Sequence, residues 1–394
     1  MIKSIKDYPI SGKKILMRVD FNVPLKNGII SDSSRIELSL PSINYILSKN
    51  CSLVLMSHLG RPKGFDKKLS LLPCAKKLSD LLKREVFMAS DCIGEEVEKK
   101  VNSLKSGEIL LLENLRFHEG EENPEKDPSF AKKLASLGEI YVNEAFSACH
   151  RKHSSIYQIV QYFPQKALMG FLLEKEISIL DKYLKNPKRP FFAIIGGAKV
   201  STKIKVLLKL LEQVDSLFIG GAMSFTFLKA IGRKVGSSIL EEDQIDSVKK
   251  ALSIASNKKI EINIPLDIVI ADKFENNANS KIISSSQDIL PPWRGMDIGP
   301  QTIDSWREKI KLAKTIFWNG PMGVFEMDNF SNGTNEIAKA IASTEAFTIA
   351  GGGDSLAAIN RLKLKEKFSH LSTGGGASLE FIEYGTLPGI EVLK

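Results

Sequence analysis

At 394 residues the chain exceeds the length at which one hydrophobic core usually stops growing, so two domains are expected. Its 43% hydrophobic and 26% charged residues are typical of a globular protein, and no apolar stretch reaches the length of a membrane span, which disfavours a membrane protein. The net charge of +9 suits a nucleic-acid partner, an anionic small molecule or a solvated surface, so charge alone does not decide among these classes.

The N-terminus and the cysteines indicate a cytoplasmic protein. The first residues, "MIKSIKDYPISGKK", lack the apolar core of a signal peptide. The cysteines are scattered and show neither CxxC nor zinc-type spacing. They are Cys51, Cys74, Cys92 and Cys149. We therefore expect a cytoplasmic location and reduced, structural thiols.

Short apolar runs alternate with amphipathic segments through the first half of the chain. The runs are "KILMRVDFNVPL", "SLVLMS", "EVFMAS", "EILLLENLRF" and "IYVNEAF". Helix-like segments such as "IELSLPSINYILSK" and "LPCAKKLSDLLKR" lie between them. Continuous apolar strands that alternate with helices predict a parallel sheet covered on both faces.

The second half repeats this alternation after a helical segment that ends at "NPKRP", a stop for helices. Its apolar runs are "PFFAIIGGAK", "SLFIGGAM", "LDIVIADKF", "TIFWNGPMGVF", "AFTIAGGG" and "FSHLSTGGG". The predicted fold class is α/β, with two doubly wound parallel-sheet (Rossmann-like) domains at 1–170 and 187–376, joined by a hinge helix at 171–186.

Basic side chains follow four apolar runs of the first half. They are Arg18 near Asp20 and Asn22, His58 and Arg61, Arg116 and His118, and His150, Arg151 and His153. A single arginine after a strand is usually a surface ion-pair partner, and a lone histidine is usually a packed one. Because parallel strands deliver their carboxyl ends to one edge, the coincidence across four loops predicts a site for a small, multiply anionic molecule.

Glycine turns, rather than arginines, follow the strands of the second half. A glycine turn before a helix lets backbone N–H groups approach an anion, although glycine triplets also serve as plain turns. We expect anion cradles at "GGGDS" and "STGGGAS", with Lys199 and Lys203 on the same phosphates and Asp354 holding Mg²⁺. Neither GxxxxGK[ST] nor GxGxxG occurs, which disfavours a P-loop NTPase and a dehydrogenase.

Eight motifs, from about residue 15 to the C-terminus, resemble those of the phosphoglycerate kinase family in order and spacing. They are "RVDFNVPL", "SHLGRPKG", "LLENLRFHEGEE", "VNEAFSACHRKHSS", "GGAKVSTKI", "GPMGVFE", "GGGDS" and "STGGGASLE". The resemblance implies reversible transfer of a phosphoryl group between 1,3-bisphosphoglycerate and ADP, a step of glycolysis and gluconeogenesis. It also implies a monomer whose two domains close about the hinge helix, with the tail at 377–394 packed on the N-terminal domain.

The resemblance also implies a set of site residues. By matching motifs, 3-phosphoglycerate would be bound in the N-terminal domain by Asp20, Asn22, Arg35, His58, Arg61, Arg116, His150 and Arg151. The nucleotide would contact Gly197, Lys199, Lys203, Gly220, Gly221, Gly295, Asn319, Pro321, Gly323, Glu326, Gly352, Gly353, Asp354 and Ser355. Catalysis would rest on Arg35, Lys199, Lys203, Gly352 and Gly375, with amides of Gly374–Gly376 completing the cradle and Asp354 holding Mg²⁺.

The sequence departs from the family pattern beside the fourth motif. The usual "NDAFGTAHR" is "NEAFSACHR", with Glu144 for aspartate, Ser147 for glycine and Cys149 for a small apolar residue. These changes flank His150 and Arg151 and affect how those two residues are placed.

Two other functions are considered beside this one. A nucleic-acid-binding protein would spread basic residues and aromatics over one face, whereas the prominent arginines stand at strand ends. A kinase for another small carboxylate would alter the arginine set, whereas "SHLGRPKG" and "HRKHSS" are intact. We therefore expect small-molecule substrates and no nucleic-acid or membrane partner.

Overall fold

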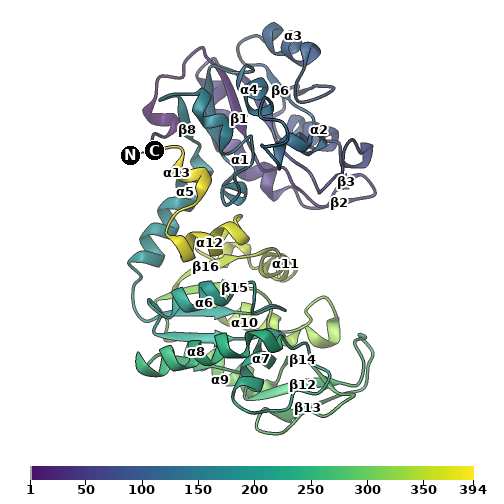
Figure 1. Ribbon diagram of the computed structural model, residues 1–394, viewed down its shortest axis with the longest axis vertical. Coiled ribbons are helices and arrows are strands. Elements are labelled where there is room, and N and C mark those ends of the chain that lie inside the picture. Colours follow the sequence, from purple (N-terminus) through teal and green to yellow (C-terminus); the bar gives the residue numbers. More distant parts are fainter. Residues whose placement is uncertain (1) are drawn as a thin grey trace. The chain divides into compact units, whose positions relative to one another are not determined.

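The computed structural model describes residues 2–394 and separates into two compact units. The first unit runs to Ser178 and includes Thr386–Lys394, and the second is Ile179–Gly385 (Figure 1). The boundary falls inside helix α5 (Phe171–Leu180), which continues as a π-helical turn, η7 (Asp181–Lys185). No helix among the described residues is long and apolar enough to cross a bilayer.

The first unit contains a six-stranded, wholly parallel sheet. Its order is β5 (Phe87–Met88), β6 (Ile109–Leu111), β4 (Ser52–Met56), β1 (Lys14–Arg18), β7 (Ile140–Asn143) and β8 (Ala167–Met169). Its other elements are helices α1 (Ser34–Ser48), α2 (Leu72–Leu82), α3 (Glu95–Ser103) and α4 (Phe130–Ala135), and a hairpin of β2 (Leu25–Lys26) and β3 (Ile29–Ile30). Every residue of β4 and β7 is buried, which explains why the sequence shows continuous apolar runs.

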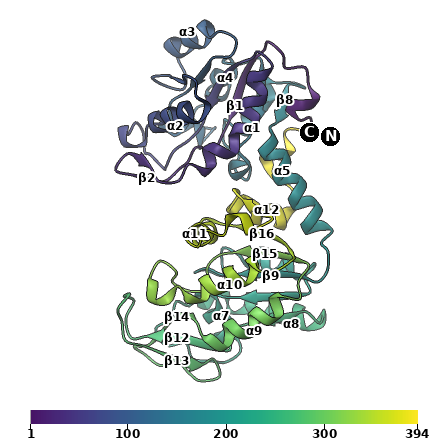
Figure 2. The same cartoon turned by 180° about the vertical axis from the view of Figure 1, so that it is seen from behind.

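The second unit contains a second parallel sheet of six strands. Its order is β11 (Glu261–Asn263), β10 (Ser216–Ile219), β9 (Phe191–Ile195), β15 (Thr315–Asn319), β16 (Phe347–Gly351) and β17 (His370–Ser372). Helices α6 (Ile204–Leu210), α7 (Met223–Ala230), α8 (Ile245–Asn257) and α12 (Gly376–Tyr384) form one layer. Helices α9 (Pro300–Ile310), α10 (Asn332–Ala342) and α11 (Gly353–Arg361) form the other, in front in Figure 2. Two doubly wound sheets confirm the predicted fold class.

A separate antiparallel sheet in the second unit was not predicted. The run "LDIVIADKF", expected in the parallel sheet, instead forms β12 (Asp267–Ala271) between β13 (Ser280–Ser284) and β14 (Arg294–Ile298). A short apolar run does not reveal the direction of its neighbours, and β13 is too exposed to show an apolar pattern.

The C-terminal tail divides differently from the expected 377–394. Residues 377–385 belong to the second unit, because α12 packs against α6 and buries Ala377, Phe381 and Ile382. Residues 386–394 lie in the first unit and form α13 (Pro388–Glu391), where the Gly389 N–H donates to the Cys149 carbonyl at 2.8 Å.

Candidate active site

Most of the predicted binding residues follow the carboxyl ends of parallel strands, whereas Arg35 lies in α1 and Gly295 lies in the antiparallel strand β14. In each sheet the chain runs outward in both directions from a central pair, β1 and β7 in the first unit and β9 and β15 in the second. Ligands of open α/β sheets bind beyond strand ends where the connections diverge in this way. Each unit therefore has its own candidate site, and we describe the two sites separately.

Arg35 lies in the first turn of α1 and is held by Asp20. Its Nη1 donates to Asp20 Oδ2, which also accepts the hydroxyl hydrogen of Ser147. The other carboxylate oxygen accepts the Asn22 backbone N–H at 3.0 Å. Asp20 is nearly buried, whereas the side chain of Arg35 is 35% exposed. Asp20 thus orients a guanidinium that remains partly exposed.

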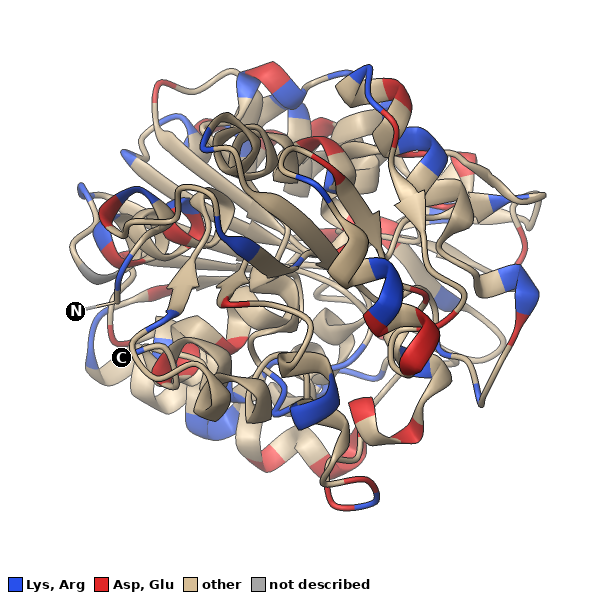
Figure 3. Cartoon of the chain, turned by 90° about the horizontal axis from the view of Figure 1, so that it is seen from above, with Lys and Arg blue, Asp and Glu red and all other residues tan. Residues whose placement is uncertain are grey.

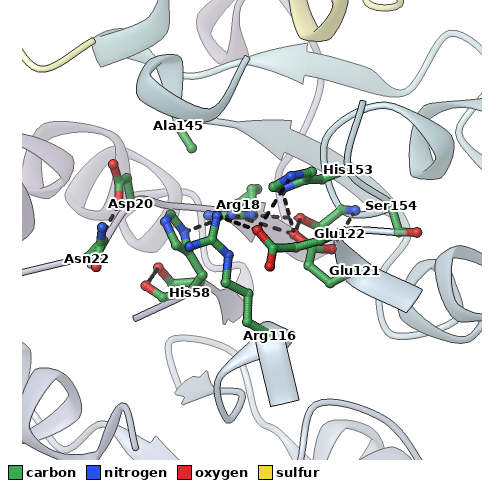
Figure 4. Close-up of polar contacts among 12 residues, drawn as sticks. Arg18, Asp20, Asn22, His58, Arg116, Glu121, Glu122, Ala145, His153 and Ser154 are labelled. Atoms are coloured by element: carbon green, nitrogen blue, oxygen red, sulfur yellow. Dashed lines mark hydrogen bonds and ion pairs between the residues drawn. The ribbon is translucent and has the colours of Figure 1, made fainter. Parts of the chain in front are cut away.

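His58 is neutral and has a defined tautomer, because Arg18 and Arg116 lie beside it (Figure 4). Nη2 of Arg18 is 3.1 Å from His58 Nδ1, and a guanidinium can only donate, so the ring carries its proton on Nε2. Burial and the neighbouring arginines hold the pKa of His58 well below its usual value. His58 can therefore offer an N–H donor but no charge at neutral pH.

Arg116 and Asn22 are both tied to Gly60. Arg116 Nη1 donates to the Gly60 carbonyl at 2.6 Å, and its Nη2 lies 2.9 Å from Glu122 Oε1. The Gly60 N–H donates to Asn22 Oδ1 at 2.9 Å. The Nε–H of Arg116 is buried without an acceptor. The loop that contains Gly60 and continues into Arg61 is therefore held by two side chains, Arg116 and Asn22, that follow two other strands.

The positive charge of this region comes from arginine and not from histidine. Arg61 and Arg151 are exposed, and no partner for either guanidinium is found within residues 2–394. Burial, followed by the charge of Arg151, lowers the pKa of His150 to about 4, so its ring is neutral near pH 7. We call Arg35, His58, Arg61, Arg116, His150 and Arg151 the basic cluster.

Three residues that were expected at the anion site of the first unit instead contact other residues inside that unit. Arg18 is fully buried, with Nε donating to Ser155 Oγ at 2.8 Å and Nη2 3.7 Å from Glu121 Oε1. His153 is buried against Glu121 and Glu122, and burial lowers its pKa to about 3.

His118, the third of these residues, binds Asp91 at 2.6 Å and stacks on the ring of Phe130. The Cys92 thiol lies within 4.8 Å of both ligand atoms, but burial keeps its pKa well above the usual value, so it stays protonated. These contacts come from distant segments, which strand-end position does not reveal.

A cavity of about 220 Å³ opens among the loops of the second unit. Of the expected nucleotide contacts it brings together Gly197, Gly221, Gly295, Pro321, Gly323, Glu326 and Asp354. Its remaining walls are largely apolar, and include Phe225, Ile239, Ile268, Phe274 and Met296, which were not predicted. An apolar slot with carboxylates at its edge suits a planar base and its polar sugar.

Several glycines of the cavity serve loop packing rather than ligand approach. A Cβ at Gly221 would lie 2.5 Å from the Gly197 nitrogen, and one at Gly220 would lie 2.4 Å from Met322 Sδ. The N–H groups of Gly197 and Gly221 donate to the carbonyls of Pro321 and Met322. The amides of Gly197 and Gly221 are therefore already occupied, and these glycines allow three loops to pack closely.

The two glycine triplets differ from the glycines just described. Each triplet comes immediately before a helix whose N-cap residue provides no side-chain cap. Gly352, with a φ of +93°, precedes α11, and Gly375, with a φ of +48°, precedes α12. The first amides of a helix have no partner within it and favour an anion. The N-termini of α11 and α12, at Gly352, Gly353, Gly375 and Gly376, are therefore able to bind an anion.

Lys199 and Lys203 differ in their surroundings. Lys199 is exposed, whereas Lys203 Nζ donates to the Gly196 carbonyl at 2.6 Å and to Asn319 Oδ1 at 2.7 Å. Burial lowers the pKa of Lys203 to about 8, although Asp354 opposes that shift. Asn319 is buried and Ser355 Oγ accepts the Gly320 N–H, so both of these expected contacts support the loops.

The cavity has two exposed carboxylates that could hold a magnesium ion, Glu326 and the predicted residue Asp354. Asp354 lies in the first turn of α11, lines the cavity and is exposed, and its carboxylate has no hydrogen-bonding or ion-pairing partner among residues 2–394. Mg²⁺ is bound in many nucleotide sites by one or two carboxylates, phosphate oxygens and water. An unpaired carboxylate in the first turn of α11 is consistent with that arrangement.

Asp297 lines the cavity and was missed by sequence reasoning. It is buried on β14 and accepts the N–H groups of Gly333 at 2.7 Å and Ile298 at 2.9 Å. Burial raises its pKa to about 7. A Cβ at Gly323 would lie 2.1 Å from its Oδ1, so this carboxylate shapes the loop after β15. Nothing in the short string "RGMDI" distinguishes it from a surface aspartate.

Two α/β units, one with an arginine-rich site and one with a cavity beside two uncapped helix ends, define a phosphotransferase that acts on small anionic substrates. A sequence model of the family described as "Phosphoglycerate kinase" matches residues 5–384. The chain belongs to the phosphoglycerate kinase family.

Proteins similar in sequence or structure match this chain along nearly its whole length. The phosphoglycerate kinase of Dictyoglomus turgidum is 50% identical over 398 residues, covering 100% of this chain and 98% of its own. That of Aquifex aeolicus is 50% identical, covering 98% and 96%. The solved phosphoglycerate kinase structure from Coxiella burnetii superposes with a TM-score of 0.86 at 36% identity, covering 100% and 99%. The chain is thus a transferase that moves a phosphoryl group reversibly between 1,3-bisphosphoglycerate and ADP.

Proposed function

We propose that the basic cluster binds 3-phosphoglycerate or 1,3-bisphosphoglycerate, and that the cavity of the second unit binds the nucleotide with Mg²⁺. One observation carries this assignment: the four arginines of the basic cluster, two of them without a partner among residues 2–394, belong to one unit, and a largely apolar cavity at the start of α11 belongs to the other. Arginine suits the carboxylate and phosphate of a small acid, and helix N-termini suit a polyphosphate.

The chemistry needs no general base in this arrangement. A carboxylate of the acid is ionised near pH 7, so its oxygen can form the new bond to the γ-phosphorus while the bond to the ADP oxygen breaks. The protein must align the groups and place positive charge around the transferred phosphoryl group. Arg35, Lys199, Lys203 and the amides at Gly352 and Gly375 would supply that charge. A magnesium ion at Asp354 would neutralise phosphate charge.

The proposal includes a motion, an oligomeric state and a location. The acid and the nucleotide belong to different units, so we propose that α5 acts as a hinge and that closure excludes water before transfer. We further propose a cytoplasmic monomer. Basic and acidic residues are interspersed along the chain in Figure 3, which does not favour a nucleic-acid surface.

The test is ATP consumption by the purified protein, with a coupling dehydrogenase that removes the acyl phosphate. Turnover should require ATP, 3-phosphoglycerate and Mg²⁺ together, and chelation of the metal should abolish it. If ATP bound but no turnover followed with 3-phosphoglycerate, the assignment of the basic cluster would be wrong. Turnover that persisted without divalent metal would contradict the role of Asp354.

The lowered pKa of Lys203 predicts a pH dependence. Its ammonium is present below pH 8 and is lost as the pH rises through about 8, so kcat/KM for ATP should fall above that pH. Lys203→Arg should remove this fall, because a guanidinium stays charged. Asp354 raises the pKa of Lys203, so Asp354→Asn should move the fall to lower pH. An identical profile in all three proteins would show that another group is responsible.

A further inference from the structure

Helix α5 begins at a residue that cannot cap it. Gly170 precedes the helix and has no side chain, so the first amides must find acceptors elsewhere. The Phe171 N–H donates to Ser42 Oγ at 2.8 Å, and the Leu172 N–H lies 3.1 Å from both carboxylate oxygens of Glu144. The cap is thus supplied by α1 and by the segment after β7.

Glu144 and Ser42 are bonded to each other and are buried. The Ser42 hydroxyl donates to Glu144 Oε1 at 2.5 Å, and the serine and the glutamate are 0% and 1% exposed, respectively. A Cβ at Gly170 would lie 2.0 Å from Glu144 Oε2, so glycine at this position leaves room for the carboxylate. Burial raises the pKa of Glu144 to about 7, with Glu174 contributing in the same direction. We call Ser42, Glu144 and the amides of Phe171 and Leu172 the buried junction.

The buried junction is connected to the basic cluster by two short paths. Ser42 and Arg35 are seven residues apart on α1, which places them two turns apart on the same face. Ser147, three residues after Glu144, donates to the Asp20 oxygen that also holds Arg35. The Glu144 N–H itself donates to the Arg18 carbonyl at 2.9 Å, which fixes this segment to β1.

We propose that Glu144 is a positioning residue for phosphoryl transfer, which couples the placement of Arg35 to the start of the hinge helix through the buried junction. This inference rests on the proposed function, because it takes α5 as the hinge and Arg35 as a group that supplies charge to the transferred phosphoryl. Glu144 touches no substrate. It acts by holding α1, the segment after β7 and the first turn of α5 in one arrangement.

The test compares Glu144→Gln, Glu144→Asp and Ser42→Ala with a matched control. Glu113 is also a buried glutamate that follows a strand and, with Ser70, caps the start of a helix, α2. Glu113→Gln therefore removes the same charge from an equivalent cap in the same unit, without touching α5. Each variant is assayed for kcat, for the Michaelis constants of the acid substrate and of ATP, for thermal midpoint and for amide exchange at residues 171–173.

Glu144→Gln should lower kcat by about 10- to 100-fold, because small misplacements of catalytic groups cost this much. The Michaelis constant of the acid substrate should rise, that of ATP should stay within about twofold, and amide exchange at 171–173 should accelerate. Glu144→Asp retains both oxygens on a shorter side chain and should restore part of kcat. Glu113→Gln should lose thermal stability and keep kcat.

If Glu144→Gln showed faster exchange at 171–173 but unchanged kcat, the proposal would be overturned. Glu144 would then only cap α5. An equal loss of kcat in Glu113→Gln would overturn it as well, because general destabilisation would then explain the effect. If Glu144→Gln did not fold, Ser42→Ala, which removes only a hydroxyl, would decide in the same way. Failure of the proposed function itself would be seen separately, as wild-type protein without turnover that depends on 3-phosphoglycerate.

Discussion

Replacing Arg35 by alanine is expected to lower kcat by about 10³- to 10⁵-fold, the range of arginine residues that stabilise phosphoryl-transfer transition states. The guanidinium is fixed by Asp20 and its side chain is 35% exposed, so its position is set before substrate arrives. Its loss removes charge that acts mainly in the transition state. The Michaelis constant of ATP should therefore change little while kcat falls.

Folding should be affected only modestly by this change. Asp20 is nearly buried, but without Arg35 it still accepts the Asn22 N–H and the Ser147 hydroxyl, so we expect a loss of about 1 kcal/mol. Arg35→Lys should give an intermediate rate, because an ammonium keeps the charge but lacks the planar fork. Arg84→Ala is the control, since Arg84 is an exposed arginine of the same unit whose side chain donates, within residues 2–394, only to the Gly107 carbonyl. An Arg35→Ala protein with kcat within tenfold of wild type would refute the assignment.

The fold was predictable because its strands are buried on both faces. β4, β9 and β15 read as uninterrupted apolar runs, and each glycine turn or arginine after them marks a strand end. β12 was misplaced, because an apolar run of five residues is compatible with either sheet and its partner β13 is mostly exposed. Local patterns thus identified strands but not their neighbours.

The sequence predicts which residues follow the ends of strands, but not which way their side chains point. Arg18 and Arg116 both follow apolar runs in the sequence. Arg18 is nevertheless buried, because it forms an ion pair with Glu121 and a hydrogen bond with Ser155, which are more than 100 residues away. Gly220 and Gly221 were predicted as nucleotide contacts, and the sequence does not reveal that close contacts with Met322 and Gly197 also require glycine there. Side-chain orientation depends on such long-range partners, which no motif contains.

Arg18→Met is expected to lower the free energy of unfolding by about 3–5 kcal/mol, because it leaves the buried Glu121 carboxylate without its cation. Total stability of a domain is about 5–15 kcal/mol, so this is a large fraction. The double variant Arg18→Met, Glu121→Gln should recover most of the loss, since no unpaired charge remains. Arg84→Met, at an exposed position, should stay within about 0.5 kcal/mol of wild type.

The loss of unfolding free energy in Arg18→Met should also depend on pH. The direction of this dependence shows whether the unpaired Glu121 carboxylate causes the loss. Burial already raises the pKa of Glu121, and Arg18 is the first of the groups that oppose this rise. Without Arg18 the folded-state pKa moves further above the unfolded value, so the folded state gains stability by protonation at low pH and loses it as the pH rises through the raised pKa. The penalty, measured by denaturant unfolding, should therefore be larger at pH 8 than at pH 5, and this difference should vanish in the double variant. A penalty of equal size at both pH values would mean that lost packing and the bond to Ser155, rather than an unpaired carboxylate, make Arg18 necessary to the first unit.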